Sequence, residues 1–211
     1  MSDERKITAA EVKQLRDATG AGVMDAKRAL GEANGDFEGA RDLLRQWGLA
    51  GVEKRAARQA ADGMVAHYLH QVNPELPAKL AVLVELNCET DFVAKTPEFK
   101  ELGRDIAMHV AAEEPRWVSR EEVPQEFIDK EKSVLLGSET VKGKPENVVE
   151  RIIEGQLNSL LTGRGGVLLE QKFLKDESGK KTVADVIGDL AASVKENIVV
   201  RRFVRLKVGE E

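Results

Sequence analysis

Apolar residues recur at helical spacing through the first fifty residues, and polar breaks separate them into three groups. Thr8 and Glu11 have the spacing of a capping box, which predicts a helix that begins near residue 9. Gly20–Gly22 is expected to end this helix, Asp36 is suited to cap the third helix, and Gly48 is expected to end it. The pattern therefore predicts short helices over residues 9–19, 23–33 and 37–48.

The composition changes after this helical part. Residues 53–62 are charged and rich in alanine, which predicts a helical linker. Residues 64–70 and 79–88 are rich in β-formers or continuously apolar, and the prolines of 73–77 lie between them, which is typical of a β-hairpin with a loose loop. The predicted division is a helical module (1–52), a linker (53–62) and a core domain (63–211).

Helices and strands alternate in the remainder of the chain. A helix over residues 98–112 has Pro97 in its first turn and one apolar face that includes Phe99 and His109. Further predicted elements are a helix from Pro124 that continues past Leu136 to a break at Gly143–Pro145, a helix over 145–161, a strand over 167–174, a helix capped by Thr182 and a strand over 197–208. This order predicts an α+β fold in which helices pack on a small antiparallel sheet.

Charge and composition exclude several classes of protein. The 211 residues include 32 Lys and Arg against 37 Asp and Glu, a net charge of −5. Direct nucleic-acid binding is not expected, because phosphate contacts need a surplus of positive charge. One cysteine, Cys88, indicates a reducing compartment. The N-terminus has no apolar stretch and the apolar runs are too short for a membrane helix, so a cytoplasmic protein without membrane contact is predicted.

No residue pattern indicates catalysis, a cofactor or a metal. Gly179–Thr182 resembles the end of a phosphate loop but lacks the first glycine and the Ser or Thr after the lysine. His67 and His70 would point to opposite faces of a strand, and one Cys with three His does not favour a zinc site. Cys88 and His109 are interpreted as core residues. We therefore expect a protein without covalent chemistry of its own.

The corner between the first two predicted helices leaves three interpretations open. It is a tight turn in a small bundle, a DNA-reading helix-turn-helix, or a protein-docking corner on which Val23 and Met24 are exposed. Residues 1–54 contain 9 basic and 10 acidic side chains and no basic face, which speaks against DNA.

The segment Glu89–Val93 directly follows the apolar residues of a predicted strand. Phe92 lies seven residues before Phe99, so the pattern alone favours a core position for Phe92. Pro97 speaks against this position, because it separates the two segments. In the alternative, Asp91 and Phe92 project from a short rigid turn and enter a pocket of a partner.

Three stretches carry a close resemblance to a known family. Residues 15–30, 87–95 and 202–210 resemble signatures of bacterial translation elongation factor Ts, and the similarity covers essentially the whole chain. The resemblance implies an N-terminal three-helix module of the ubiquitin-associated type. It also implies guanine-nucleotide exchange on elongation factor Tu: displacement of Mg²⁺, release of GDP and stabilisation of the nucleotide-free partner.

The same resemblance implies which residues meet the partner. The docking contacts would be Arg16, Val23 and Met24, and the segment that dislodges Mg²⁺ would be Thr90, Asp91, Phe92 and Val93. On that analogy Phe92 wedges between partner elements and Asp91 holds the segment in register. The longest family members have a duplicated core half and this chain has one, so a homodimer is expected. A ubiquitin-associated-like adaptor without exchange activity is the alternative.

Overall fold

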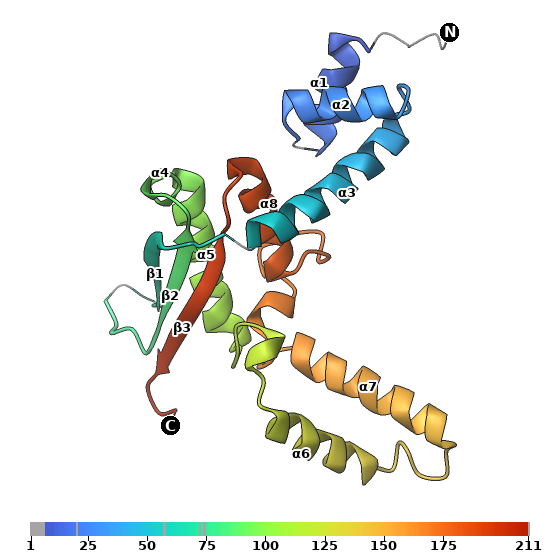
Figure 1. Cartoon of the computed structure of the whole chain (residues 1–211). Coiled ribbons are helices and arrows are strands. Elements are labelled where there is room, and N and C mark those ends of the chain that lie inside the picture. Colours follow the sequence, from blue (N-terminus) through green and yellow to red (C-terminus); the bar gives the residue numbers. More distant parts are fainter. Residues whose placement is uncertain (1–6, 20, 57, 72, 74, 211) are drawn as a thin grey trace.

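The computed structural model describes residues 7–19, 21–56, 58–71, 73 and 75–210. Its helices are α1 (Ala9–Thr19), α2 (Val23–Glu32), α3 (Phe37–Ala56), α4 (Asp91–Ala94), α5 (Pro97–Glu113), α6 (Gln125–Leu136), α7 (Glu146–Thr162) and α8 (Val183–Val194), and its strands are β1 (Asp62–His70), β2 (Leu80–Cys88) and β3 (Val199–Lys207). The strands form one antiparallel sheet in the order β1-β2-β3, which confirms the α+β class (Figure 1).

The three N-terminal helices form a small core of their own. The predicted capping box begins α1: the Thr8 amide donates to Glu11 Oε2 at 2.8 Å, and the Glu11 amide donates to Thr8 Oγ1 at 3.3 Å. Asp36 caps α3 by accepting a hydrogen bond from the Gly39 amide at 3.2 Å. The buried residues of this core are Val12, Leu15, Ala26, Ala29, Leu30 and Ala40. The three predicted helices are therefore confirmed.

The third helix is longer than predicted. It passes through Gly48 and ends at Ala56, so the predicted end at Gly48 is wrong. A glycine inside a helix costs only ~1 kcal/mol relative to alanine. Contact between α3 and α8 can offset that cost (Figure 1). Gly20, part of the predicted end of the first helix, lies outside the described residues.

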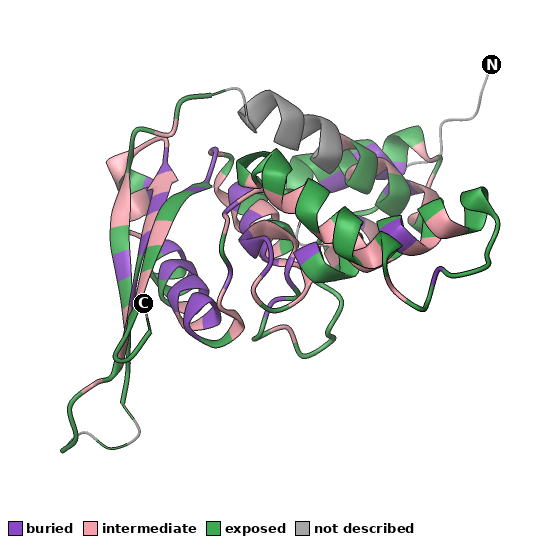
Figure 2. Cartoon of the chain, turned by 90° about the horizontal axis from the view of Figure 1, so that it is seen from below, coloured by how far each residue is buried: buried purple, intermediate pink, exposed green. Residues whose placement is uncertain are grey.

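The sheet is built from the predicted hairpin and the predicted C-terminal strand. β1 pairs with β2 over its whole length, and β3 pairs with the other edge of β2, with a register shift between Glu85 and Leu86. Alternate residues of β2 are buried under the helices: Val82, Val84, Leu86 and Cys88. The opposite sheet face carries exposed apolar side chains, namely Val65, Leu69, Leu83, Val204 and Leu206. Figure 2 shows exposed residues along the strands and buried residues where the helices meet the sheet.

Helix α5 supplies most of the helical contact with the sheet. Thr96 caps it by accepting from the Phe99 amide at 3.3 Å, and Pro97 occupies its first turn as predicted. The predicted apolar face is buried: Phe99, Leu102, Ile106, His109 and Val110. A Cβ on Gly103 would lie 3.0 Å from the Ala66 Cβ, so the missing side chain allows the close approach of α5 to β1.

His109 is buried on this face and is fully hydrogen-bonded. Its Nδ1 accepts from the Leu174 amide at 3.2 Å, and its Nε2 lies 3.1 Å from Gln171 Oε1. The Gln171 amide group donates to the Gly163 carbonyl at 2.9 Å, which leaves its oxygen facing His109. An imidazole that accepts at Nδ1 and donates at Nε2 is neutral. Burial lowers the pKa of His109, and the bond to Gln171 partly opposes this shift.

Helices α6 and α7 form a hairpin that extends away from the sheet (Figure 1). The prediction that Pro145 opens the second helix is confirmed, since Pro145 is the N-cap of α7, which begins at Glu146. The prediction that Gly143–Pro145 breaks the preceding helix is wrong. The first helix of the pair ends at Leu136 rather than continuing beyond it, because Gly137 forms its C-cap and turns follow.

The predicted strand over residues 167–174 is wrong. The segment forms a single 3₁₀ turn (Leu168–Glu170) between two isolated bridges, Trp117 with Val167 and Lys172 with Thr182. The apolar pattern of this segment reflects burial in the core, where Val167, Leu168 and Phe173 lie. A short apolar run cannot distinguish a strand from another buried segment.

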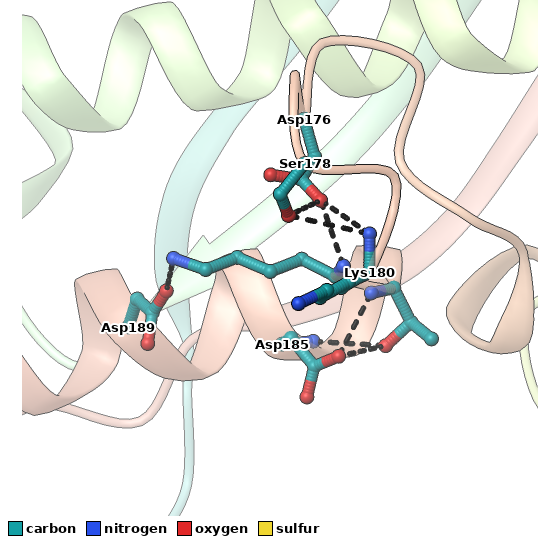
Figure 3. A network of polar contacts seen from close by, with 7 residues as sticks. Asp176, Ser178, Lys180, Asp185 and Asp189 are labelled. Carbon is teal, nitrogen blue, oxygen red and sulfur yellow. Dashed lines mark hydrogen bonds and ion pairs between the residues drawn. The ribbon is translucent and has the colours of Figure 1, made fainter.

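The turn that leads into α8 is closed by polar contacts (Figure 3). Asp176 accepts from the amides of Lys180 and Lys181, both at 2.8 Å. The Lys181 amide contributes most to lowering the pKa of Asp176, which falls to about 2. Thr182 and Asp185 then form the capping box of α8, which confirms the predicted cap. Among the described helices, none is both long enough and apolar enough to cross a membrane.

Candidate functional site

Helix α4 directly follows strand β2 and presents Phe92 to solvent. The Phe92 side chain is 79% exposed, whereas its neighbour Val93 is 8% exposed and packs into the core. The core position that the pattern alone favoured for Phe92 is therefore wrong. Thr96 is extended (ψ 147°) before Pro97, so α4 and α5 are separate helices and do not share a face.

Glu196 closes the base of this turn. Its Oε2 accepts from the Glu89 amide at 3.1 Å and the Thr90 amide at 3.0 Å, and its Oε1 accepts from the Thr90 hydroxyl at 2.6 Å. The Cys88 thiol donates to the Thr90 carbonyl at 3.2 Å. Burial raises the pKa of Cys88, and the Glu196 charge adds to this effect, so the thiol remains a donor. The polar atoms of Thr90 are thus engaged within the chain.

The far side of α4 is fixed as well. The Thr96 hydroxyl donates to the Val93 carbonyl at 2.8 Å. Asp91 forms an ion pair with Lys95 one turn later, and this hydrogen bond raises the pKa of Lys95. Phe92 therefore projects from a support that is held at both ends.

The α1–α2 corner is the second exposed apolar point. Met24 is 74% exposed and Val23 is 52% exposed, as the docking interpretation expected. Thr19 stabilises the corner: its hydroxyl donates to the Leu15 carbonyl at 2.7 Å and accepts from the Ala21 amide at 3.3 Å. Arg16, the third predicted docking residue, is half-exposed and forms an ion pair with Asp17 at 3.0 Å.

The predicted site residues thus form two separate groups, one on α4 and one at the α1–α2 corner (Figure 1). Sequence reasoning missed Glu196, since it lies more than a hundred residues from the turn that it holds. His70 bonds to the Tyr68 hydroxyl at 3.0 Å. In the part of the chain that the structure describes, no cluster of three or more His, Cys, Asp or Glu could hold a metal ion.

Exposed apolar side chains on rigid, hydrogen-bonded turns are typical of a factor that docks on another protein. A family model described as elongation factor TS matches residues 51–210. The chain belongs to the elongation factor Ts family, and its role lies in the elongation step of protein biosynthesis.

Similar proteins match over nearly the full length. The chain is 53% identical to the elongation factor Ts of Thermosipho melanesiensis over 204 residues, which cover 97% of this chain and 100% of the relative. It is 51% identical to that of Fervidobacterium nodosum over 205 residues, with 97% and 100% covered. It is 50% identical to that of Carboxydothermus hydrogenoformans over 204 residues, with 97% and 90% covered.

Proposed function

We propose that this chain is the guanine-nucleotide exchange factor of elongation factor Tu and has no covalent chemistry of its own. It promotes GDP release by displacing Mg²⁺ and then stabilises the nucleotide-free partner. The observation that carries the proposal is Phe92, an aromatic side chain that is 79% exposed on a fixed one-turn helix in a member of the elongation factor Ts family.

Displacing a magnesium ion requires only a small movement of its ligands. Mg²⁺ demands near-octahedral geometry at ~2.0–2.1 Å, so a wedge that shifts one protein ligand weakens its binding. GTPases hold the phosphates of the nucleotide partly through this ion. A rigid Phe92 that enters the partner beside the nucleotide site can therefore loosen the ion and GDP together, and Asp91 next to it supplies a polar contact.

Exchange follows from linkage between the two ligands of the partner. If this protein binds nucleotide-free elongation factor Tu more tightly than the GDP-bound form, GDP must weaken its binding by the same factor. Couplings between sites are typically ~1–3 kcal/mol, or ~5–150-fold, and an efficient exchange factor should reach the upper end. The cellular ratio of GTP to GDP then decides which nucleotide enters.

The α1–α2 corner is the proposed docking point for the partner. Arg16, Val23 and Met24 would make this contact from the N-terminal module of residues 1–52. The proposed linker (53–62) joins it to the core domain (63–211), which carries α4. Docking through the module brings Phe92 to the nucleotide site as a second, intramolecular event, which raises its effective concentration.

The open face of the sheet supports the proposed homodimer. Its exposed apolar side chains are Val65, Leu69, Leu83, Val204 and Leu206. Contiguous exposed apolar patches are rare on monomers and mark interaction sites. A sheet face can pack on its own copy through a two-fold axis, since both partners then present the same surface.

One experiment separates exchange from the adaptor alternative. Elongation factor Tu loaded with a fluorescent GDP is mixed with excess unlabelled GDP and substoichiometric amounts of this protein. An exchange factor accelerates the loss of fluorescence and turns over, and excess GDP weakens its complex with the partner. An adaptor of the ubiquitin-associated type binds equally well in either nucleotide state and leaves the release rate unchanged, and that result would overturn the proposal.

A further inference from the structure

The turn between α8 and β3 brings Glu196 to the base of α4. Helix α8 ends at Val194, and Lys195 adopts a left-handed conformation (φ 61°) that reverses the chain. The Glu196 carboxylate then receives three donors, the amides of Glu89 and Thr90 and the Thr90 hydroxyl, at 2.6–3.1 Å. Hydrogen bonds to an ionised carboxylate are stronger than bonds between neutral groups.

Helix α4 depends on support from outside itself. It has 4 residues, and an isolated helix this short is not stable in water. Thr90 stands at its N-cap, where a threonine hydroxyl commonly accepts a bond from a helix amide. Instead, within the described residues, the hydroxyl donates to Glu196. The usual local cap is thus replaced by a bond to a distant element, which ties the direction of α4 to the α8–β3 turn.

A second set of bonds ties the same turn to the chain that enters the core domain. Glu89 Oε1 accepts from the Asn197 amide at 2.7 Å, and the Asn197 side chain donates to the Arg58 carbonyl at 2.9 Å. The Arg58 guanidinium lies 3.4 Å from Glu89 Oε1. The end of β2, the α8–β3 turn and the segment before β1 therefore meet at the base of α4.

We infer that Glu196 is a positioning residue for nucleotide exchange: it sets the direction in which Phe92 projects, without touching the partner. This inference rests on the proposed function. Docking through Arg16, Val23 and Met24 does not involve Glu196, so loss of its carboxylate should leave docking intact. The step that depends on a correctly placed Phe92 should slow.

The chain offers a matched control for this carboxylate. Asp185 also accepts from one backbone amide and one threonine hydroxyl, those of Thr182, at 2.8 and 2.9 Å (Figure 3). It lies in the first turn of α8, at the opposite end of the helix from the turn that carries Glu196. Asp185→Ala therefore removes the same kind of bonds without releasing the base of α4.

The test measures GDP release from elongation factor Tu over a range of concentrations of each variant. For Glu196→Ala the maximal release rate should fall about 10–100-fold, the range that follows a misplaced functional group. The half-saturating concentration should change by no more than about twofold, since docking is intact. Glu196→Gln keeps one acceptor oxygen and should fall between the wild type and Glu196→Ala. Asp185→Ala should keep the wild-type maximal rate.

A structural readout accompanies the kinetics. In Glu196→Ala, hydrogen exchange of the Glu89 and Thr90 amides should accelerate in the free protein, while that of the Asp185 amide is unchanged. If Glu196→Ala does not fold, Thr90→Val removes one of the three bonds, and the same slower release at unchanged half-saturation is expected. A wild-type protein that fails to accelerate GDP release overturns the proposed function. An active wild type whose Glu196→Ala and Glu196→Gln variants match Asp185→Ala overturns only the positioning role.

Discussion

Replacing Phe92 by alanine should test its proposed contact with the partner without disturbing the fold. Fully burying a phenylalanine side chain is worth ~1.5–3 kcal/mol. Because Phe92 is 79% exposed, only about a fifth of that, ~0.5 kcal/mol, contributes to folding. The remaining four fifths, about 2 kcal/mol, are available when the ring enters the partner. If the ring is buried in the state from which GDP leaves, its loss should slow release ~30-fold, at ~1.4 kcal/mol per tenfold.

Stopped-flow release of fluorescent GDP at saturating protein measures the rate, and urea unfolding measures the stability. Phe99→Ala is the control, because Phe99 is fully buried and its truncation should cost ~3–5 kcal/mol of stability. Phe92→Leu keeps most of the apolar surface and should retain an intermediate rate. A wild-type rate for Phe92→Ala at saturation would refute the wedge, and a stability loss above ~2 kcal/mol would refute the exposed position on which the arithmetic depends.

Three further predictions follow from the packing of the core domain. Gly188 on α8 has open space around it, so Gly188→Ala should stabilise the protein by ~0.5–1 kcal/mol. Gly103→Ala should instead destabilise the protein by up to ~2 kcal/mol, because the new Cβ would lie 3.0 Å from the Ala66 Cβ. Thermal unfolding compares the two variants, and equal stabilisation of both would contradict the close contact at Gly103. Since burial lowers the pKa of His109 below its unfolded value of 6.5, the unfolded chain binds the proton more readily, and stability should be full above about pH 6.5 and fall as the pH drops through the folded pKa. Urea midpoints at pH 8 and pH 5 should differ more in the wild type than in His109→Gln. Light scattering at micromolar concentration should give twice the chain mass of 23.2 kDa, and Leu83→Glu on the open sheet face should give the monomer; a wild-type mass of 23.2 kDa contradicts the homodimer.

Local signals predicted most of the helices and all three strands of the sheet. The Thr8–Glu11 pair begins α1 and Thr182 caps α8, because capping uses side chains within three residues of each other. The helix over 97–113 followed from its periodic apolar face and from Pro97. In each case the determining interactions join residues that are close in sequence, so a local sequence pattern can predict them.

The wrong predictions concern residues whose surroundings come from elsewhere in the chain. Gly48 does not end α3, since a single glycine only weakly disfavours a helix. The stabilising contact comes from α8, which lies far away in sequence and leaves no local signal. The apolar residues Leu168 and Phe173 in the segment 167–174 fill the core, and residues 168–170 form a 3₁₀ turn instead of a strand. Glu196 carried no sequence signal at all, because its partners Glu89 and Thr90 lie 107 and 106 positions before it.

Phe92 shows most clearly how local pattern and function diverge. Its seven-residue spacing from Phe99 would bury it if α4 and α5 were continuous, and burial would stabilise the fold. Thr96 and Pro97 instead separate the helices, and Glu196 holds the base of α4 with three bonds. An exposed phenylalanine contributes little to its own fold, and the proposed contact of Phe92 with elongation factor Tu would give this outward arrangement a role. On the proposed function, the polar residues around α4 therefore matter for nucleotide exchange as much as the aromatic ring that they support.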